Sequence, residues 1–240
     1  MALSTIKTNS IDDSAITNDK IANSTIDVTG KITGAVPVAN GGTALTSIGS
    51  ANQAMTVNSG ASALEFTTIK KAGKESIWVP ATAMYPNTTS GCAGLAQTEL
   101  GNGPELKTLD FDKDSDEFAQ FAVAFPKSWN EGTITFQAFF TAASTNTGTV
   151  AWTLAGTSLA DNGSLNTAFG TAVQATAKAH SGTSNDLDVT AESGAVTIAG
   201  SPSTDEYVFF EIKRDVSADS LTADAKLLGI KLFFTTDAAT

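Results

Sequence analysis

Cysteine, histidine and charged side chains are scarce in this sequence of 240 residues. It has one cysteine, Cys92, and one histidine, His180, so neither an intrachain disulfide nor a zinc site built from Cys and His is expected. Charged residues make up 16% of the chain, with 25 acidic against 14 basic, for a net charge of −11. This balance argues against binding nucleic acid or an anionic membrane surface, because both would repel an acidic protein.

Long apolar runs are also missing. No stretch approaches the roughly 20 apolar residues that span a bilayer, and the start, MALSTIKTNS, lacks the charged-then-apolar pattern of a signal peptide. We therefore expect a soluble protein made in the cytoplasm, with no membrane insertion. Cys92 lies among small residues in SGCAG, which favours a buried structural thiol over a reactive one.

Aromatic residues are absent from the first 65 positions, since all 18 lie at or after Phe66. Aromatic rings supply much of the buried area of a globular core, so the N-terminal part would fold poorly alone. The break predicts three regions: a fibrous stalk over 1–33, a connecting turn and hairpin over 34–74, and a C-terminal domain over 75–240.

Isoleucine recurs every five residues near the N-terminus, at Ile6, Ile11, Ile16, Ile21 and Ile26. Neither a helix nor a strand places residues five apart on one side, so the repeat predicts stacked coils or intertwined chains. A single-chain β-helix would need more coils than five blocks provide. We favour self-association, with these isoleucines as the core of a threefold stalk. A disordered polar tail with chance periodicity is the remaining alternative.

The connecting region carries turn and hairpin signals. Asn40-Gly41-Gly42 predicts a tight turn, and Gln53–Val57 with Leu64–Phe66 predicts a hairpin. Together, the Ile blocks and PVANGGTALTSIG…MTVNSGASALEF resemble the connecting modules of bacteriophage tail-fibre and other virion-fibre proteins, over about residues 5 to 67. Ala44 stands where that family's turn has a third Gly. The resemblance implies a homotrimeric fibre located in the virion, with other virion structural proteins as partners.

From residue 75 onward apolar residues alternate with polar ones, as in half-buried strands. Expected strands include 76–80, 105–111, 118–125 and 133–142, followed by strands around Trp152, Phe210 and Ile230. Segment 168–180 fits a strand better than a helix, because it is rich in Thr and Val. The fold class expected is all-β: an extended fibrous stalk, then an antiparallel β-sandwich of jelly-roll-like type.

Two groups of polar residues have side chains suited to metal binding or acid–base chemistry. Asp110, Asp112 and Asp114 alternate like the start of a calcium loop, but Ser115 and Phe121 occupy the template positions that need Gly and Glu. A looser calcium site or a solvated acidic loop remains. His180 lies in a polar turn-like segment with no nucleophile elbow in the chain, so a surface position is favoured over catalysis. No cofactor and no enzymatic activity are expected.

Aromatic residues near loops and strand ends are the candidate ligand contacts, namely Trp78, Tyr85 and Trp129. Such rings stack on sugars, although a tryptophan in a sandwich also serves as core or subunit contact. The sequence thus predicts a structural virion fibre or spike that attaches by its stalk and projects a β-sandwich for host-surface adhesion, with a host glycan as possible ligand, or for particle decoration. The alternatives are a carbohydrate-binding module on a stalk and, third, a glycan hydrolase with a carboxylate pair.

Overall fold

The computed structural model describes residues 17, 34–51, 53–68 and 73–236. The chain divides into two units, Met1–Ile69 and Lys70–Thr240. The five isoleucines of the predicted stalk core lie outside the described residues, so the threefold stalk stays a prediction. Among the described residues, no helix has the length and apolar character needed to cross a membrane.

The described part of the first unit contains the turn and the hairpin that were expected. A 3-10 turn, η2 (Val38–Asn40), ends at Gly41 with φ of 82°. Strands β1 (Gln53–Val57) and β2 (Leu64–Thr68) then pair antiparallel. The Asn58 side-chain oxygen closes this hairpin by accepting from the backbone N–H groups of Ser62 and Ala63, at 2.9 and 3.2 Å.

The glycine-rich turn before the hairpin is tightly folded. The Ala44 N–H donates to the Val36 carbonyl at 2.9 Å, and a Cβ on Gly42 would lie 2.0 Å from that same oxygen. Ala44 itself adopts φ of 57°, a conformation that favours glycine. A glycine would adopt this conformation without the steric cost that a Cβ brings.

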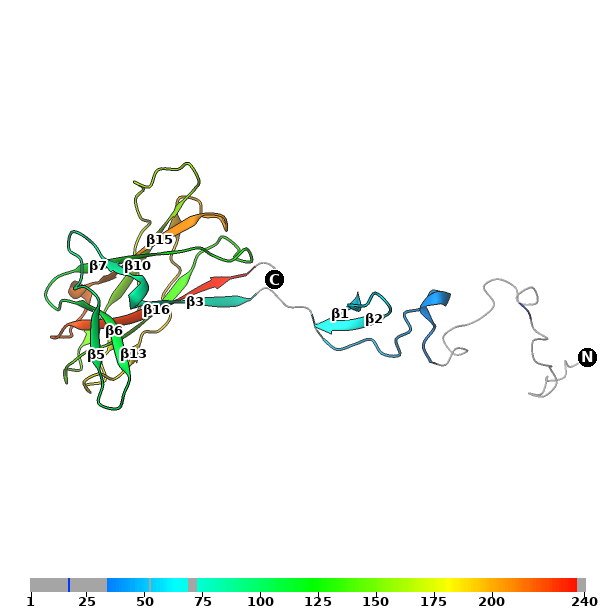
Figure 1. Ribbon diagram of the computed structural model, residues 1–240, viewed down its shortest axis with the longest axis horizontal. Helices are drawn as coiled ribbons and strands as arrows, with labels where there is room; N and C mark the ends of the chain where they lie inside the picture. Colours follow the sequence, from blue (N-terminus) through cyan, green and yellow to red (C-terminus); the bar gives the residue numbers. More distant parts are fainter. Residues whose placement is uncertain (1–16, 18–33, 52, 69–72, 237–240) are drawn as a thin grey trace, which may run out of the picture. The chain divides into compact units, whose positions relative to one another are not determined.

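The second unit is an antiparallel β-sandwich of two six-stranded sheets (Figure 1). The first sheet has the order β11-β10-β15-β7-β4, with β14 also on β10; its strands are β4 (Tyr85–Pro86), β7 (Glu117–Val123), β10 (Trp152–Leu159), β11 (Val173–Gln174), β14 (Ile198–Ala199) and β15 (Tyr207–Arg214). The second has the order β13-β8-β16-β6-β5, with β3 also on β16; its strands are β3 (Lys74–Pro80), β5 (Ala96–Glu99), β6 (Glu105–Phe111), β8 (Thr135–Thr141), β13 (Asp188–Val189) and β16 (Ala225–Thr235). The remaining elements are the pair β9 (Thr149–Val150) and β12 (Lys178–Ala179), and the 3-10 turns η3 (Ala81–Ala83) and η4 (Val216–Ala218).

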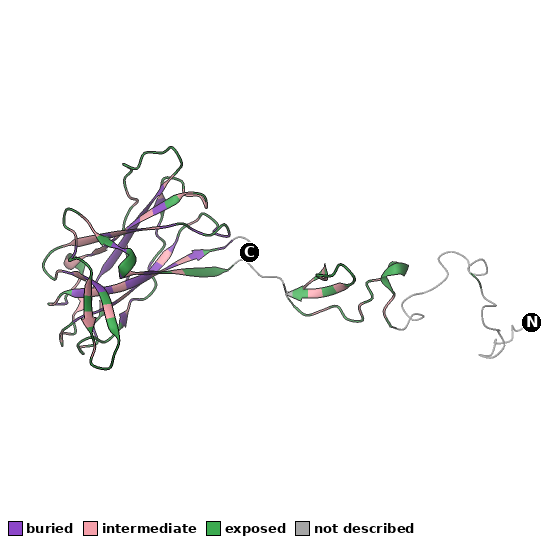
Figure 2. Cartoon of the chain, viewed as in Figure 1, coloured by how far each residue is buried: buried purple, intermediate pink, exposed green. Residues whose placement is uncertain are grey.

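The chain passes repeatedly from one sheet to the other, for example from β6 to β7 to β8 to β10, as in jelly-roll-like folds. Alternate residues of β7, β8 and β15 point inward, and in Figure 2 the buried positions lie mainly on the strands of the second unit. The core is largely aromatic and aliphatic, and its largest members include Phe111, Phe121, Phe136, Phe140, Trp152, Phe210 and Ile212. The predicted antiparallel β-sandwich is confirmed.

Three segments depart from the simple alternation. The register of β16 shifts between Leu227 and Gly229, so Leu227 is buried and Leu228, expected inside with Ile230, is half-buried. Strand β10 is buried on both faces, and β11 and β14 pair with it. Segment 168–180 forms β11 and β12 with irregular chain around them, in place of one strand.

Arg214 ends β15 and ties the end of β6 and the segment 219–223 to the core, with a side chain that is 0% exposed. Its Nε donates to Asp219 at 2.7 Å, and its Nη atoms donate to the carbonyls of Phe111, Ala223 and Leu221, each at 3.0 Å. Burial raises the pKa of Asp219 above its ordinary value, while the Arg214 guanidinium acts to lower it. One buried guanidinium thus satisfies four acceptors, a carboxylate oxygen and three backbone carbonyls.

Candidate ligand-binding face

Four aromatic rings gather on the outer face of the first sheet, and we call them the aromatic face: Tyr85, Phe169, Tyr207 and Phe209. Phe209 is at the centre, with ring centroids of Phe169 at 6.0 Å, Tyr207 at 5.9 Å and Tyr85 at 6.5 Å. The first two rings lie nearly parallel to that of Phe209, at 14° and 25°. Tyr85 and Tyr207 are 50% and 52% exposed, so this cluster presents ring surface to solvent.

A polar cluster adjoins the aromatic face. The Glu211 Oε2 atom accepts from Asn87 Nδ2 at 2.8 Å and from Gln120 Nε2 at 2.9 Å. Tyr85, Asn87 and Gln120 also line a hollow of ≈ 300 Å³, together with Pro86, Thr88 and Thr89. The Asn87 Oδ1 atom is buried and accepts no hydrogen bond within the described part of the chain. The arrangement therefore combines ring faces with an oriented carboxylate and two amides.

Strand pairing explains why these residues meet. Positions 207, 209 and 211 of β15 point outward, because Val208, Phe210 and Ile212 point into the core. Directly paired residues share a face, so Glu211 lies beside Gln120 of β7, and Gln120 lies beside Tyr85 of β4. Phe169 comes from the long connection after β10 and stacks on this row.

Of the three aromatic residues predicted as ligand contacts, the structure brings one to this site. Tyr85 belongs to the aromatic face. Trp78 is exposed as expected, at 47%, but lies on the opposite sheet. Trp129 is 1% exposed, so its expected surface position is wrong. Its indole stacks on Phe125 at 4.2 Å, and Phe125 packs on Phe234 in the core.

The three aspartates of the predicted calcium loop do not converge. Asp110 pairs with Lys226 at 2.6 Å, Asp112 accepts from the Asp114 N–H at 2.5 Å, and Asp114 pairs with Lys113. Within the described residues, no three His, Cys, Asp or Glu side chains are grouped to hold a metal ion. The looser calcium site and the acidic loop therefore remain the two alternatives, with Asp110 engaged in an ion pair.

His180 is buried, at 2% exposed, contrary to the surface position expected from its turn-like neighbours. Its Nδ1 lies 2.6 Å from Asp188 Oδ2, and its Nε2 lies 3.1 Å from the Ser144 carbonyl oxygen. Both nitrogens are therefore engaged, and neither faces a serine hydroxyl as a catalytic base must. Cys92 is buried as predicted, and burial is the main cause that raises its pKa to about 12.

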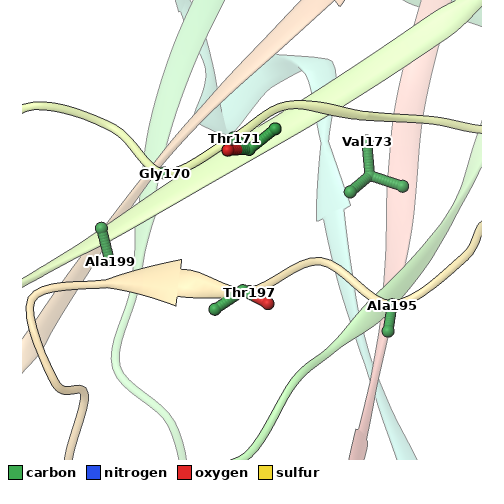
Figure 3. Close-up of a pocket in the computed structure, with 6 residues that line it drawn as sticks. All are labelled: Gly170, Thr171, Val173, Ala195, Thr197 and Ala199. Carbon is green, nitrogen blue, oxygen red and sulfur yellow. The ribbon is translucent and has the colours of Figure 1, made fainter.

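A second hollow, of ≈ 350 Å³, lies between residues 170–173 and 195–199 (Figure 3). Its lining residues are small: Gly170, Thr171, Val173, Ala195, Thr197 and Ala199. These side chains carry no charge and no aromatic ring, so this hollow offers little to orient a polar ligand. It is a weaker candidate than the aromatic face.

Sequence reasoning missed Phe169, Tyr207, Phe209 and Glu211. The segment Tyr207-Val-Phe-Phe-Glu211 contained the signal, because apolar residues occupy both parities of a strand that otherwise alternates. Two rings at outward positions of one strand are unusual for a solvated face. Phe169 had no such signal, since a loop residue's neighbours depend on the fold.

No family model matches the chain, and no curated protein matches it. Among solved structures, the chain is similar to the C-terminal CBM6 of LamC, a marine laminarinase from Zobellia galactanivorans, at 11% identity and a TM-score of 0.34, covering 66% of this chain and 98% of that one. It is also similar to a non-crystalline cellulose specific carbohydrate-binding module, CBM28, at 13% identity and a TM-score of 0.32, covering 65% and 84%. The arabinose-bound α-L-arabinofuranosidase MgGH51 is similar at 14% identity and a TM-score of 0.38, and the match covers 64% of this chain and 23% of that one. At these identities and TM-scores the likeness carries no conclusion about ligands.

Proposed function

We propose that the β-sandwich binds a neutral glycan through the aromatic face. The observation that carries this proposal is the cluster of rings around Phe209 beside the Asn87–Glu211–Gln120 group. A sugar ring has one face of polarised C–H groups and a rim of hydroxyls. The negative face of an aromatic ring attracts the polarised C–H groups of the sugar. Carboxylate and amide groups form hydrogen bonds with its hydroxyls.

The charge of the site favours an uncharged sugar. Glu211 places a carboxylate at the edge of the rings, and the whole chain has a net charge of −11. An acidic sugar or a nucleic acid would be repelled there. A neutral hydroxyl can donate to the Glu211 carboxylate, which accepts hydrogen bonds without repelling an uncharged sugar.

Glycan binding is tested with a neutral glycan array and two single-ring deletions. Tyr85→Ala and Tyr207→Ala each remove a half-exposed ring, so the fold should persist. We expect each to weaken binding at least about tenfold, which corresponds to 1.4 kcal/mol. Leu187→Ala is the matched control, because Leu187 is 59% exposed and lies elsewhere.

Two outcomes would refute the proposal. One is an array with no ligand for the unmodified chain. The other is a ligand whose affinity both tyrosine variants retain within about twofold, a difference of roughly 0.4 kcal/mol. Circular dichroism of each variant separates a lost contact from a lost fold.

A second proposal is that this domain is carried on a homotrimeric bacteriophage virion fibre, joined to other virion proteins through its N-terminal segment. The tight turn at Gly42 and Ala44 and the hairpin β1–β2 support it, since they adopt the conformations expected from the resembling modules. Sedimentation equilibrium of the full chain tests the oligomer. A monomer, or a trimer unaffected by Ile16→Asp with Ile21→Asp, would contradict it.

A further inference from the structure

A second group of rings, one exposed and two half-buried, lies on the outer face of the opposite sheet. We call it the tryptophan face; it comprises Trp78, Phe139 and Phe233 with Lys74, Lys231 and Gln137. Trp78 of β3 meets Phe139 of β8 edge-on, at 5.0 Å and 83°. Strand register places Trp78, Lys231 and Gln137 in one row across β3, β16 and β8. Strands β3 and β16 are seen side by side in Figure 1.

A glycine makes room for the Trp78 indole. Gly229 lies at the register shift of β16, and a Cβ there would come within 2.7 Å of Trp78 Cζ2 and 2.6 Å of the Val79 carbonyl oxygen. The indole therefore lies against the backbone of β16, where a side chain would otherwise stand. It remains 47% exposed, so the ring is fixed from one side and open from the other.

Lys231 gives this face a positive charge in a chain of net negative charge, whereas the charge of Lys74 is offset by Glu192. Lys74 Nζ and Lys231 Nζ lie 5.0 and 5.2 Å from the centroid of the Phe233 ring. Lys74 is paired with Glu192, which also accepts from Thr135, and these contacts lower the pKa of Glu192. In the described part of the chain, no carboxylate oxygen lies within 4.0 Å of Lys231 Nζ.

We propose that the tryptophan face is a second binding site, which takes an acidic sugar residue. The sugar ring stacks on Trp78, and its carboxylate or sulfate group accepts hydrogen bonds from Lys231. Charge distinguishes the two faces of the sandwich, since Glu211 marks the aromatic face and Lys231 marks this one. The site stands whether or not the aromatic face binds a neutral glycan.

Tryptophan fluorescence of the full chain tests the proposal directly. Of the three tryptophans, Trp129 and Trp152 are 1% and 0% exposed, so a contacting ligand acts mainly on the emission of Trp78. The probes are tetragalacturonate, which carries carboxylates, its methyl ester, which has the same rings without the charge, and a sulfated galactan oligosaccharide. We expect saturable changes with at least one acidic probe and at least about tenfold weaker binding of the ester.

Matched variants assign the binding to this face. Lys231→Gln should weaken binding of the acidic probe about tenfold, and Trp78→Ala should abolish the fluorescence change and reduce affinity measured by calorimetry. Lys127→Gln is the control for net charge, because Lys127 is an exposed lysine paired with Asp205 elsewhere on the domain. Tyr207→Ala should leave the affinity unchanged, which separates this site from the aromatic face.

Several results would overturn the proposal. One is that neither acidic probe changes the emission, and another is that the methyl ester binds as tightly as the acid. A third is that Lys127→Gln weakens binding as much as Lys231→Gln does, which would mean unspecific charge attraction. A fourth is that the unmodified domain self-associates and that Trp78→Ala restores the monomer without affecting glycan binding, which would make this face a contact between copies of the chain.

Discussion

Replacing Arg214 by methionine should destabilise the sandwich more than any surface substitution. Arg214 is fully buried and donates four hydrogen bonds, one to the Asp219 carboxylate and three to backbone carbonyls. Methionine has similar length but donates nothing, so Asp219, whose side chain is 3% exposed, becomes a buried charge without a partner. Removing one member of a buried ion pair typically costs about 3–5 kcal/mol.

This loss is large beside the total stability of a domain, which is about 5–15 kcal/mol. For a domain of this size it corresponds to a fall in melting temperature of roughly 6–20 °C. Urea denaturation followed by circular dichroism measures the free energy, and calorimetry gives the melting temperature. A loss below about 1 kcal/mol would refute the reasoning, because that is within the range of exposed ion pairs.

The pH dependence of the same variant is a second check. Burial already raises the pKa of Asp219, and Arg214 opposes that rise, so the variant raises it further. A carboxyl group with a folded pKa above its unfolded value binds more protons when folded, and its folded state loses stability as pH rises. The deficit of Arg214→Met should therefore be smaller near pH 4 than at neutral pH, with both measured from urea midpoints. An equal deficit at both pH values would show that Asp219 is not the group left unpaired.

Three further predictions concern buried or half-buried groups. Cys92 should react with a thiol reagent at about pH 8 far more slowly in the folded chain than in denaturant, because its pKa is raised to about 12; equal rates would contradict its burial. Glu117→Gln should keep or slightly raise the free energy of unfolding at neutral pH, because burial raises the pKa of Glu117 and the amide oxygen of Gln can still accept from the Asp112 N–H. Ionised Glu117 lowers the stability of the unmodified chain more as pH rises, so the advantage of the variant in urea melts should vanish toward about pH 4. A large loss of stability at pH 7 would count against this. Asp188→Ala leaves His180 Nδ1 buried without its partner and should cost about 1–3 kcal/mol in the same assay, whereas an unchanged midpoint would show the pair to be dispensable.

Alternation along the sequence was sufficient to predict the core strands. Ile134, Phe136 and Phe140 lie buried as their spacing indicates, because a strand with one solvated face must repeat every two residues. The same rule failed at Leu228, since the register shift at Gly229 gives the residues before it the opposite parity from Ile230 and the residues after it. A bulge depends on how the strand pairs with its neighbour, and the two-residue periodicity of one strand does not specify that pairing.

The candidate site was only partly accessible from the sequence. Tyr85 and Trp78 were expected at the surface from their positions near Pro residues and strand ends, and both are about half exposed. Trp129 was placed wrongly, because its turn-like neighbours Asn130 and Gly132 are on the surface while the indole packs inward on Phe125. Which rings meet is decided by the order of strands in the sheet, and that order comes from tertiary packing.

The pairing of β3 with β16 has a mechanical consequence. The residues preceding Lys74 enter the domain at the start of β3, and the Gly73 carbonyl and N–H bond to Thr236 there, at 2.8 and 2.9 Å. Seven residue pairs, from Lys74↔Thr235 to Pro80↔Gly229, join the two strands. A pull along β3 strains these pairs together in shear, whereas a pull across it opens them one after another like a zipper. Tension directed along this strand would therefore meet the larger resistance to forced unfolding.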